Sequence, residues 1–424
     1  TGMIRQNFNA DWTVEKGDGN SRMNSFLGNT QTKTVHLPYD AMIHEARTPD
    51  TKNGAQTGFY PGGEYIFQKH FTAPQAWQGK PVSLVFEGVY QTALVYLNGW
   101  LLTRNVNGYA EFTVEAGPYL KYGADNLLKV IADNSLEPNS RWYTGSGIYR
   151  PVRLLVGNKV YLPQDTVRIT TREADEGFAL LDVTAQVQSA STVTERVTLQ
   201  QTICRKGTAV LTDRQNLLLQ PGESRTVSFR YCVDSPALWS PENPNLYTSI
   251  MQVLEGEEEL DREETGFGIR TLSIDAAHGV RINGQTVKLR GACIHHDNGI
   301  LGAATLPDAE ERRIRQLKEA GFNAIRSSHH PAGRALLDAC DRYGVLVMDE
   351  LSDVWNVRKN PYDYALYFEQ DWKPTIQKMV AKDYNHPSVI LYCVGNEISE
   401  AGSESGAETN RRLCNTFREL DPTR

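Results

Sequence analysis

Hydrophobic and polar residues alternate with a period of two between Glu64 and Val156, and such alternation predicts strands with one buried face. The clearest runs are 65–70, 93–97 and 128–132. One run ends in Asn98-Gly99, a dipeptide that favours a type I′ hairpin because both central residues of that turn need a positive φ. Short strands broken by Gly, Pro and Asn predict a β jelly-roll sandwich over residues 1–157.

The alternation continues into a second block, in which Ala179, Leu181 and Val183 lie on one face and the polar residues between them on the other. A block of about 110 residues with this pattern predicts an immunoglobulin-like β-sandwich over residues 158–273. The acidic stretch 255–259 within this block is interpreted as a solvated hairpin tip rather than a binding site.

After Ser273 the pattern changes to short apolar runs that alternate with segments of helical period. The predicted strands are 287–291, 322–326, 345–348 and 389–394, and the predicted helices are 308–320, 335–343, 369–382 and 407–420. For the first of these helices we expect Asp308 as the N-cap, Glu311 as its capping-box partner and Gly321 as the stop.

Near-continuous apolar strands separated by helices predict a parallel sheet with both faces covered. Two architectures fit these βα units. One is a doubly wound sheet, although no G-x-G-x-x-G loop follows a strand and no dinucleotide site is therefore indicated. The other is the N-terminal half, strands one to four, of a (β/α)8 TIM barrel over residues 274–424.

Composition argues against several classes of protein. The chain of 424 residues carries 44 basic and 51 acidic side chains, a net charge of −7, which argues against a nucleic-acid partner. It has neither a long apolar stretch nor an apolar N-terminal segment, so we expect no membrane span and no secretory signal. The cysteines are scattered without a C-x-x-C pair, which favours a reducing, cytoplasmic location.

Polar clusters follow all the predicted strands of the last region, and in a TIM barrel the chemistry lies at the carboxyl ends of the strands. The clusters are Cys293, His295, His296 and Asp297; Arg326, Ser327, Ser328, His329 and His330; Asp349, Glu350, Asp353 and Trp355; and Asn396 and Glu397. Glu397 is the strongest candidate, because a carboxylic acid beside other carboxylates has a raised pKa and donates a proton near neutral pH. The alternative for Glu397 is a residue at a helix N-terminus that the helix dipole favours.

Several of these residues also have a structural interpretation. Adjacent histidines on an extended chain point in diverging directions and no H-E-x-x-H spacing is present. Hydrogen bonding to sugar hydroxyls, or packing, is therefore favoured over a metal site. Arg326 either forms a buried structural ion pair or orients a carboxylate. Trp355 is either a stacking platform for a sugar ring or part of the core.

Motifs along the whole chain resemble glycoside hydrolase family 2, the β-galactosidase and β-glucuronidase family. They lie at residues 140–150, 238–247, 266–270, 290–297, 323–331, 340–350 and 385–397. The family's order of domains is a sugar-binding jelly roll, an immunoglobulin-like sandwich and a TIM barrel, which is the order that the hydrophobic pattern predicts. We therefore expect the second architecture, half of a barrel, for the last region.

The resemblance implies a retaining exo-glycosidase that hydrolyses terminal β-D-galactosides in carbohydrate catabolism, with β-glucuronidase as the alternative specificity. Its substrate would be a β-linked oligosaccharide or glycoside. Glu397 would be the general acid/base, Asn396 would hold the 2-hydroxyl of the sugar, and Arg326 would brace the nucleophile. Retention needs an acid/base and a nucleophile whose carboxyl groups are about 5–5.5 Å apart.

The resemblance also implies a set of substrate contacts. His295 and His329 would contact sugar hydroxyls. Arg141 would reach across from the jelly roll and help to close the sugar pocket, and Trp355 would line it. Like Arg326 and Asn396, these four residues are therefore expected to lie around Glu397.

The sequence departs from the family at its metal positions. Some members bind magnesium through a Glu and a His after strand three, whereas the aligned positions here are Val354 and Asn356. We therefore predict no metal ligand in this chain, and consider Mg or Na ions only for a full-length enzyme.

A second departure concerns the nucleophile, which in the family is a Glu at the end of strand seven. The sequence stops at Arg424, after the fourth predicted helix, so none of its residues can take that role. We therefore expect it to be part of a longer enzyme and to be inactive on its own. The exposed edge strands of a half-barrel favour association between copies of the chain, so we expect a homo-oligomer. The alternative in another class is a non-catalytic carbohydrate-binding module.

Overall fold

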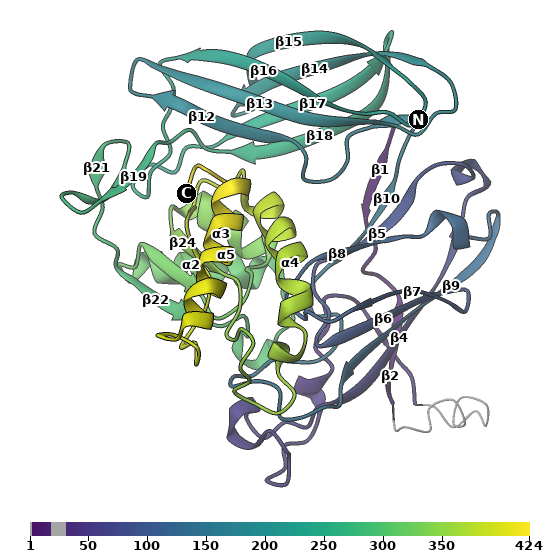
Figure 1. The fold of residues 1–424 in the computed structure, drawn as a ribbon. Helices are drawn as coiled ribbons and strands as arrows, with labels where there is room; N and C mark the ends of the chain where they lie inside the picture. The colour runs from purple at the N-terminus through teal and green to yellow at the C-terminus, as the bar shows by residue number, and fades with distance from the viewer. Residues whose placement is uncertain (1, 18–30) are drawn as a thin grey trace.

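The computed structural model describes residues 2–17 and 31–424, and Figure 1 shows how they are arranged. One β-sandwich, in purple and blue, lies at the lower right, and a second, in teal, lies across the top. The helices of the green and yellow region lie at the left, beside the first sandwich and below the second. The expected fold class, two sandwiches followed by part of a TIM barrel, is confirmed.

The first sandwich consists of two antiparallel sheets. The six-stranded sheet runs β3 (Lys33–Val35), β2 (Trp12–Gly17), β4 (Gly63–Ala73), β9 (Ala124–Asn134), β6 (Thr92–Leu97) and β7 (Trp100–Asn105). The four-stranded sheet runs β1 (Ile4–Asn7), β10 (Val152–Val156), β5 (Val82–Phe86) and β8 (Phe112–Glu115). Short 3-10 helices lie between the strands: η1 (Met42–His44), η2 (Gly54–Thr57), η3 (Gln75–Trp77) and η4 (Gly117–Tyr119). Asn98 and Gly99 join β6 to β7 with φ values of 51° and 86°, which confirms the predicted turn.

The second sandwich also pairs two antiparallel sheets. In one sheet β13 (Phe178–Ser189) lies at the centre, bonded to β11 (Val160–Tyr161), β12 (Arg168–Ala174) and β16 (Ser224–Asp234). The other sheet runs β15 (Thr208–Leu219), β14 (Glu195–Arg205), β17 (Tyr247–Glu255) and β18 (Glu258–Phe267). The alternating residues Ala179, Leu181 and Val183 are fully buried, as predicted. The acidic stretch 255–259 spans the turn from β17 to β18, so the predicted hairpin tip is confirmed.

A small antiparallel sheet leads into a parallel one. Its strands are β19 (Leu272–Asp275), β20 (Gly279–Ile282) and β21 (Gln285–Thr286). The parallel strands are β22 (Gly291–Ile294), β23 (Ala324–Ser327), β24 (Leu346–Glu350) and β25 (Val389–Cys393). The helices are η5 (Gly299–Leu301), α2 (Pro307–Glu319), α3 (Arg334–Tyr343), η6 (Tyr364–Leu366), α4 (Phe368–Asp383) and α5 (Glu404–Leu420).

The four parallel strands lie in the sheet in the same order as in the chain. A doubly wound sheet reverses its strand order at a switch point, whereas a TIM barrel does not. The order therefore favours the half-barrel over the doubly wound alternative. Among the described residues no helix is both long and apolar enough to cross a membrane.

The first barrel helix does not begin as the sequence predicts. Leu306 occupies the N-cap and Pro307 the first helical position, and no side chain caps the helix. Proline is well suited to that position, because its fixed φ is helical and it has no N–H to satisfy. The predicted capping box is therefore wrong, and Glu311 instead accepts a hydrogen bond from the hydroxyl of Tyr343 at 2.8 Å.

The first parallel strand begins later than predicted. The expected strand 287–291 is replaced by β22 at Gly291–Ile294. Val287 donates its N–H to Val280 in the small sheet, and Arg290 donates to the side chain of Asn323. Pairing with β23 thus starts at Gly291.

Trp239 joins the second sandwich to the barrel. Its side chain is fully buried and packs with Ala324, Leu346 and Ile390 of the parallel strands. Its indole N–H donates to the backbone oxygen of Asp341 at 2.9 Å. This one side chain therefore contacts both the strands and helix α3.

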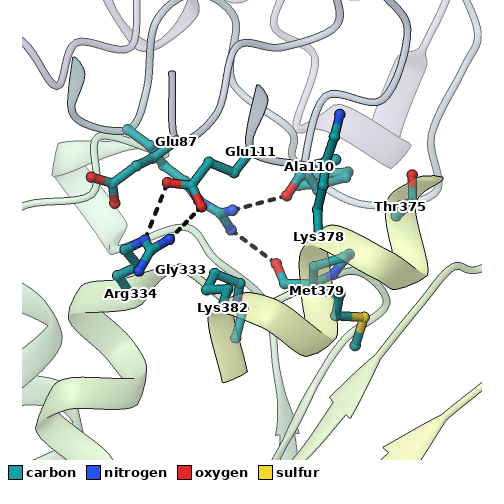
Figure 2. Close-up of a pocket in the computed structure, with 13 residues that line it drawn as sticks. Glu87, Ala110, Glu111, Gly333, Arg334, Thr375, Lys378, Met379 and Lys382 are labelled. Atoms are coloured by element: carbon teal, nitrogen blue, oxygen red, sulfur yellow. Dashed lines mark hydrogen bonds and ion pairs between the residues drawn. The ribbon is translucent and has the colours of Figure 1, made fainter. Parts of the chain in front are cut away.

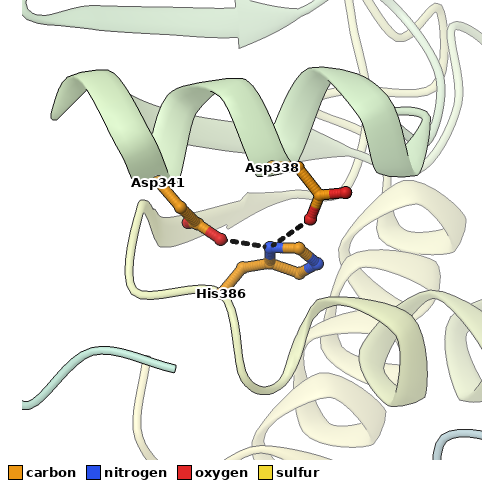
Figure 3. Close-up of side chains that lie close together, drawn as sticks. All are labelled: Asp338, Asp341 and His386. Carbon is orange, nitrogen blue, oxygen red and sulfur yellow. Dashed lines mark hydrogen bonds and ion pairs between the residues drawn. The ribbon is translucent and has the colours of Figure 1, made fainter. Parts of the chain in front are cut away.

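Asp341 and His386 connect α3 to the loop before β25 (Figure 3). Nδ1 of His386 lies 2.6 Å from Oδ2 of Asp341 and 3.9 Å from Oδ1 of Asp338. Oδ1 of Asp341 accepts a hydrogen bond from the hydroxyl of Ser388 at 2.6 Å. Burial lowers the pKa of His386, but the carboxylates of Asp341 and Asp338 raise it by more, so the imidazolium form is favoured.

Two buried carboxyl groups lie at the end of helix α4. Asp383 and Asp349 are both fully buried, and Lys382 pairs with Asp383. The Oδ2 atoms of both aspartates have no donor within the described residues. Burial and the carboxylate of Asp349 raise the pKa of Asp383 well above its ordinary value, against the effect of Lys382. Asp383 is therefore protonated more readily in the folded state than in the unfolded chain.

We predict that Trp239→Ala lowers the free energy of unfolding by about 3–5 kcal/mol, because the substitution leaves a large cavity between the second sandwich and the barrel. Urea denaturation measures this change. Trp100→Ala is the matched control, since Trp100 is 66% exposed on the tip of the β6–β7 hairpin and should change stability by less than about 0.5 kcal/mol. Equal effects of the two substitutions would contradict the assigned packing.

We predict that Asp383→Asn stabilises the chain increasingly as the pH rises. A raised pKa in the folded state means that stability is highest at low pH and falls as the pH rises through that pKa, whereas asparagine stays neutral. Urea midpoints at pH 5 and pH 8 should therefore differ more in the wild type than in the variant. Asp234→Asn, on the exposed face of β16, should leave the pH dependence as it is.

Candidate active site

Glu397 lies just beyond the carboxyl end of β25, beside the loop 135–151 of the first sandwich. Gly395 allows the tight turn between the end of β25 and Glu397. A Cβ there would come within 2.7 Å of the side chain of Ile398 and 3.0 Å of the indole nitrogen of Trp355. The backbone of Glu397 has a φ of 43°, a left-handed conformation that residues other than glycine rarely adopt.

The Glu397 carboxylate has a cationic neighbour rather than the carboxylates expected from the sequence. Its side chain is 70% exposed, and Oε2 accepts a hydrogen bond from Nη1 of Arg141 at 2.9 Å. Arg141 therefore does reach across from the first sandwich, as predicted. Arg141 also binds Asp353, the carboxylate that follows β24.

Asp353 connects Arg141 to the barrel. Arg141 binds it with two bonds, from Nε to Oδ2 at 3.1 Å and from Nη2 to Oδ1 at 2.8 Å. Asn396 and Lys359 donate to the same Oδ1 atom at 2.9 Å and 3.0 Å. Burial raises the pKa of Asp353, but the bonds from Arg141, Asn396 and Lys359 lower it by more, so the carboxylate stays charged.

The side chain of Asn396 is oriented from both ends. Nδ2 donates to Asp353, and Oδ1 accepts from Nη2 of Arg326 at 3.3 Å. The Nδ2 group has two hydrogens, and the bond to Asp353 uses one of them. This orientation suits an amide that donates its other hydrogen to a ligand hydroxyl.

Of the two interpretations of Arg326, a structural ion pair or a residue that orients a carboxylate, the structure shows the ion pair. Its Nε pairs with the fully buried carboxylate of Glu350, whose Oε1 lies 2.8 Å from Nδ1 of His329. Burial lowers the pKa of Arg326, but Glu350 raises it by more. The carboxylate that Arg326 braces among the described residues is therefore Glu350.

His295 is held between the two domains. Its Nδ1 lies 2.7 Å from the backbone oxygen of Ser328, and its ring stacks on Trp142 with centroids 5.3 Å apart. Burial lowers the pKa of His295, so the neutral ring is favoured, with Nδ1 as donor and Nε2 as acceptor. The ring of His295 lies 5.6 Å from that of His329, which contacts Glu350, the partner of Arg326.

The aromatic residue beside these histidines is Trp142, which sequence reasoning passed over in favour of Trp355. Trp355 is only 5% exposed, belongs to a hydrophobic cluster with Leu351 and Phe368, and donates its indole N–H to Val394. The structure therefore favours the core alternative for Trp355. The position of Trp142 next to Arg141 was the signal available in the sequence.

His296 and His330 pack against the first sandwich. His330 stacks on Tyr109 with centroids 4.0 Å apart, and Nε2 of His296 lies 2.8 Å from the backbone oxygen of Thr144. Burial lowers the pKa of His296 to about 3 and that of His330 well below its ordinary value. Both rings are therefore neutral packing residues.

The magnesium positions do not fit that ion. Val354 is buried and aliphatic and Asn356 is exposed, so neither position offers the carboxylate or imidazole that such a site uses. Across residues 2–17 and 31–424, one set of at least three His, Cys, Asp and Glu side chains has the spacing of a metal site: Asp338, Asp341 and His386. It precedes β25, whereas Glu397 follows that strand.

A network of charged residues joins the first sandwich to the barrel (Figure 2). Arg334 of α3 faces Glu111, with Nη2 at 2.7 Å from Oε2, and its Nη1 lies 3.1 Å from Asp165 of the second sandwich. Arg150 of the first sandwich donates to the backbone oxygen of Pro331 at 3.1 Å. The position of Arg141 relative to Glu397 depends on this junction.

Models of one enzyme family match all three regions of the chain. The galactose-binding domain-like model of glycosyl hydrolase family 2 matches residues 12–178, the glycosyl hydrolases family 2 model matches 160–270, and its TIM barrel model matches 276–424.

Individual relatives match over nearly the whole chain. "Beta-galactosidase BoGH2A" of Bacteroides ovatus is 37% identical over 96% of this chain and 48% of its own length. A "putative beta-glucuronidase" of Formosa agariphila is 31% identical over 99% of this chain and 39% of its own length. A crystal structure of a glycosyl hydrolase family 2 member from Bacteroides cellulosilyticus has a TM-score of 0.95 at 37% identity, covering 99% of this chain and 55% of that one.

The chain thus spans about half the length of the curated relatives it matches. The matches nevertheless extend over both sandwiches and the half-barrel. On this evidence the chain belongs to glycosyl hydrolase family 2.

Proposed function

We propose that this chain supplies the acid/base half of a retaining exo-glycosidase that hydrolyses terminal β-D-galactosides. The observation that carries the proposal is the exposed carboxylate of Glu397, held by Arg141 and next in sequence to the oriented amide of Asn396. Family membership supports a glycoside as the substrate. A cytoplasmic location and self-association remain proposals from the sequence alone.

The roles in the reaction follow from exposure. Glu397 would protonate the leaving oxygen in the first step and take a proton from water in the second, so it needs access to solvent and substrate. Glu350 is fully buried and paired with Arg326 and His329, so it is not available for attack on a sugar carbon. We expect the nucleophile to lie in a region of the full-length protein that corresponds to the part of the longer relatives outside this match.

The charge pairing favours a neutral sugar over a glucuronide. A glucuronidase needs a cation for the substrate carboxylate. Around Glu397 the cations Arg141 and Lys359 pair with Asp353, and Arg326 pairs with Glu350. Breaking such pairs to bind another anion is costly. The relative with the higher identity is named a β-galactosidase, which agrees with this preference.

We predict that Glu397→Gln, in the full-length protein that carries this chain, lowers kcat/KM on a disaccharide by about 10²–10⁴-fold, because the amide cannot protonate the leaving group. On a dinitrophenyl glycoside, whose leaving group needs no proton, kcat/KM should change little. Glu404→Gln, an exposed residue of the first turn of α5, is the matched control. Unchanged turnover of the disaccharide by the Glu397 variant would refute the assignment.

We predict that the full-length protein hydrolyses an aryl β-D-galactoside at least about 100-fold more efficiently than the matching β-D-glucuronide, because the site cations within this chain already have acidic partners. Initial rates on the two substrates measure the ratio. A ratio in favour of the glucuronide would reverse the specificity and leave the roles of Glu397 and Asn396 in place.

A further inference from the structure

Lys359 lies in the loop between β24 and η6, and its backbone is fixed. Oδ2 of Asp363 accepts hydrogen bonds from the N–H groups of Lys359 at 2.7 Å and Asn360 at 2.8 Å. Oδ1 of Asp363 accepts from the N–H of Ala365 at 3.1 Å, and Asp363 is itself only 4% exposed. The loop therefore delivers the Lys359 side chain from a defined position.

The ammonium group of Lys359 is fully engaged. Nζ donates to Oδ1 of Asp353 at 3.0 Å, to the backbone oxygen of Asp353 at 2.7 Å and to the backbone oxygen of Asn396 at 2.7 Å. An ammonium group has three hydrogens, and these acceptors account for all of them. The side chain is 12% exposed. Lys359 thus binds Asp353 and Asn396 and has no N–H left for a substrate.

Two of the three acceptors of Lys359 are linked to Glu397. The oxygen of Asn396 belongs to the peptide group that directly precedes Glu397, the residue with the left-handed φ of 43°. A conformation that a glutamate rarely adopts persists only where its surroundings hold it. The carboxylate of Asp353, a second acceptor, holds Arg141, which in turn binds Oε2 of Glu397.

From these contacts we propose that Lys359 is a positioning residue for the acid/base: it fixes the Asn396–Glu397 peptide and the Asp353 carboxylate, and through them the direction of the Glu397 side chain. The proposal rests on the proposed function of Glu397. Without the ammonium group two backbone oxygens lose their donor, the peptide turns, and the acid is displaced from the leaving oxygen. The loss therefore falls on the step that needs the proton.

The test is Lys359→Met in the full-length protein, assayed on two β-D-galactosides. On a disaccharide, a poor leaving group, kcat/KM should fall about 10–100-fold, a partial loss of the contribution of general acid catalysis. On a dinitrophenyl galactoside it should stay within about twofold, because that leaving group departs without a proton. A merely structural role would lower both values by the same factor, and that result would overturn the proposal.

Lys318→Met is the matched control. Nζ of Lys318 likewise donates to two backbone oxygens, those of Pro241 at 2.7 Å and Gly344 at 2.9 Å, but at the end of α2 away from Glu397. Its loss should lower the melting temperature and leave the ratio of the two kcat/KM values unchanged. If the Lys359→Met protein is insoluble, Lys359→Gln, which keeps an N–H donor, is assayed on the same substrates and should show a smaller change of that ratio in the same direction.

The wild-type protein separates the two possible failures. If it hydrolyses neither galactoside, the proposed function is wrong. If it hydrolyses both and Lys359→Met leaves their ratio unchanged, the function stands and the positioning role of Lys359 is wrong.

Discussion

Arg334 holds the three regions together, because its guanidinium contacts Glu111 of the first sandwich and Asp165 of the second from helix α3 of the barrel. Arg141, which binds the Glu397 carboxylate, comes from the first sandwich, and Glu397 lies just beyond strand β25 of the barrel. The geometry of the site is therefore a consequence of how two domains are joined. The junction is charged and partly buried, so removing one partner leaves an uncompensated charge, and this penalises any other relative orientation of the domains.

The charged side chains of the site are also paired with one another, like those of the junction. Arg141, Lys359 and Asn396 all donate to the single carboxylate of Asp353, and Arg326 is paired with Glu350. Dipoles and charges fixed before a substrate arrives cost no reorganisation during the reaction. In this arrangement the charged side chains mostly orient one another.

Period-two alternation predicted the strands of both sandwiches, and Asn98-Gly99 predicted its turn, because these signals depend on neighbours in the sequence. The predicted helix cap and strand start were wrong because a neighbouring residue or a distant partner, which the local pattern does not show, decides the structure there. Pro307 displaced the cap expected at Asp308, and pairing of residues 287–290 with other partners delayed β22. Of the site residues, Arg141 and Asn396 were found through motifs. Lys359 was missed because its role depends on loops about 40 residues apart coming into contact, which no local pattern reports. Trp142 and Trp355 could not be distinguished for a related reason: which aromatic ring is covered depends on the packing of loops.

Glu350 and Glu397 show how burial separates two residues that the sequence presents alike. Each is a glutamate at or just after the end of a parallel strand, preceded by a polar residue, Asp349 or Asn396. Glu350 is fully buried and contacts Nε of Arg326 and Nδ1 of His329, so its carboxylate is not open to solvent. Glu397 is 70% exposed and has one cationic contact, so it keeps the access to water that proton exchange in both directions requires. Among carboxylates with similar local sequence, the one that the fold leaves accessible is the one able to act as acid and base.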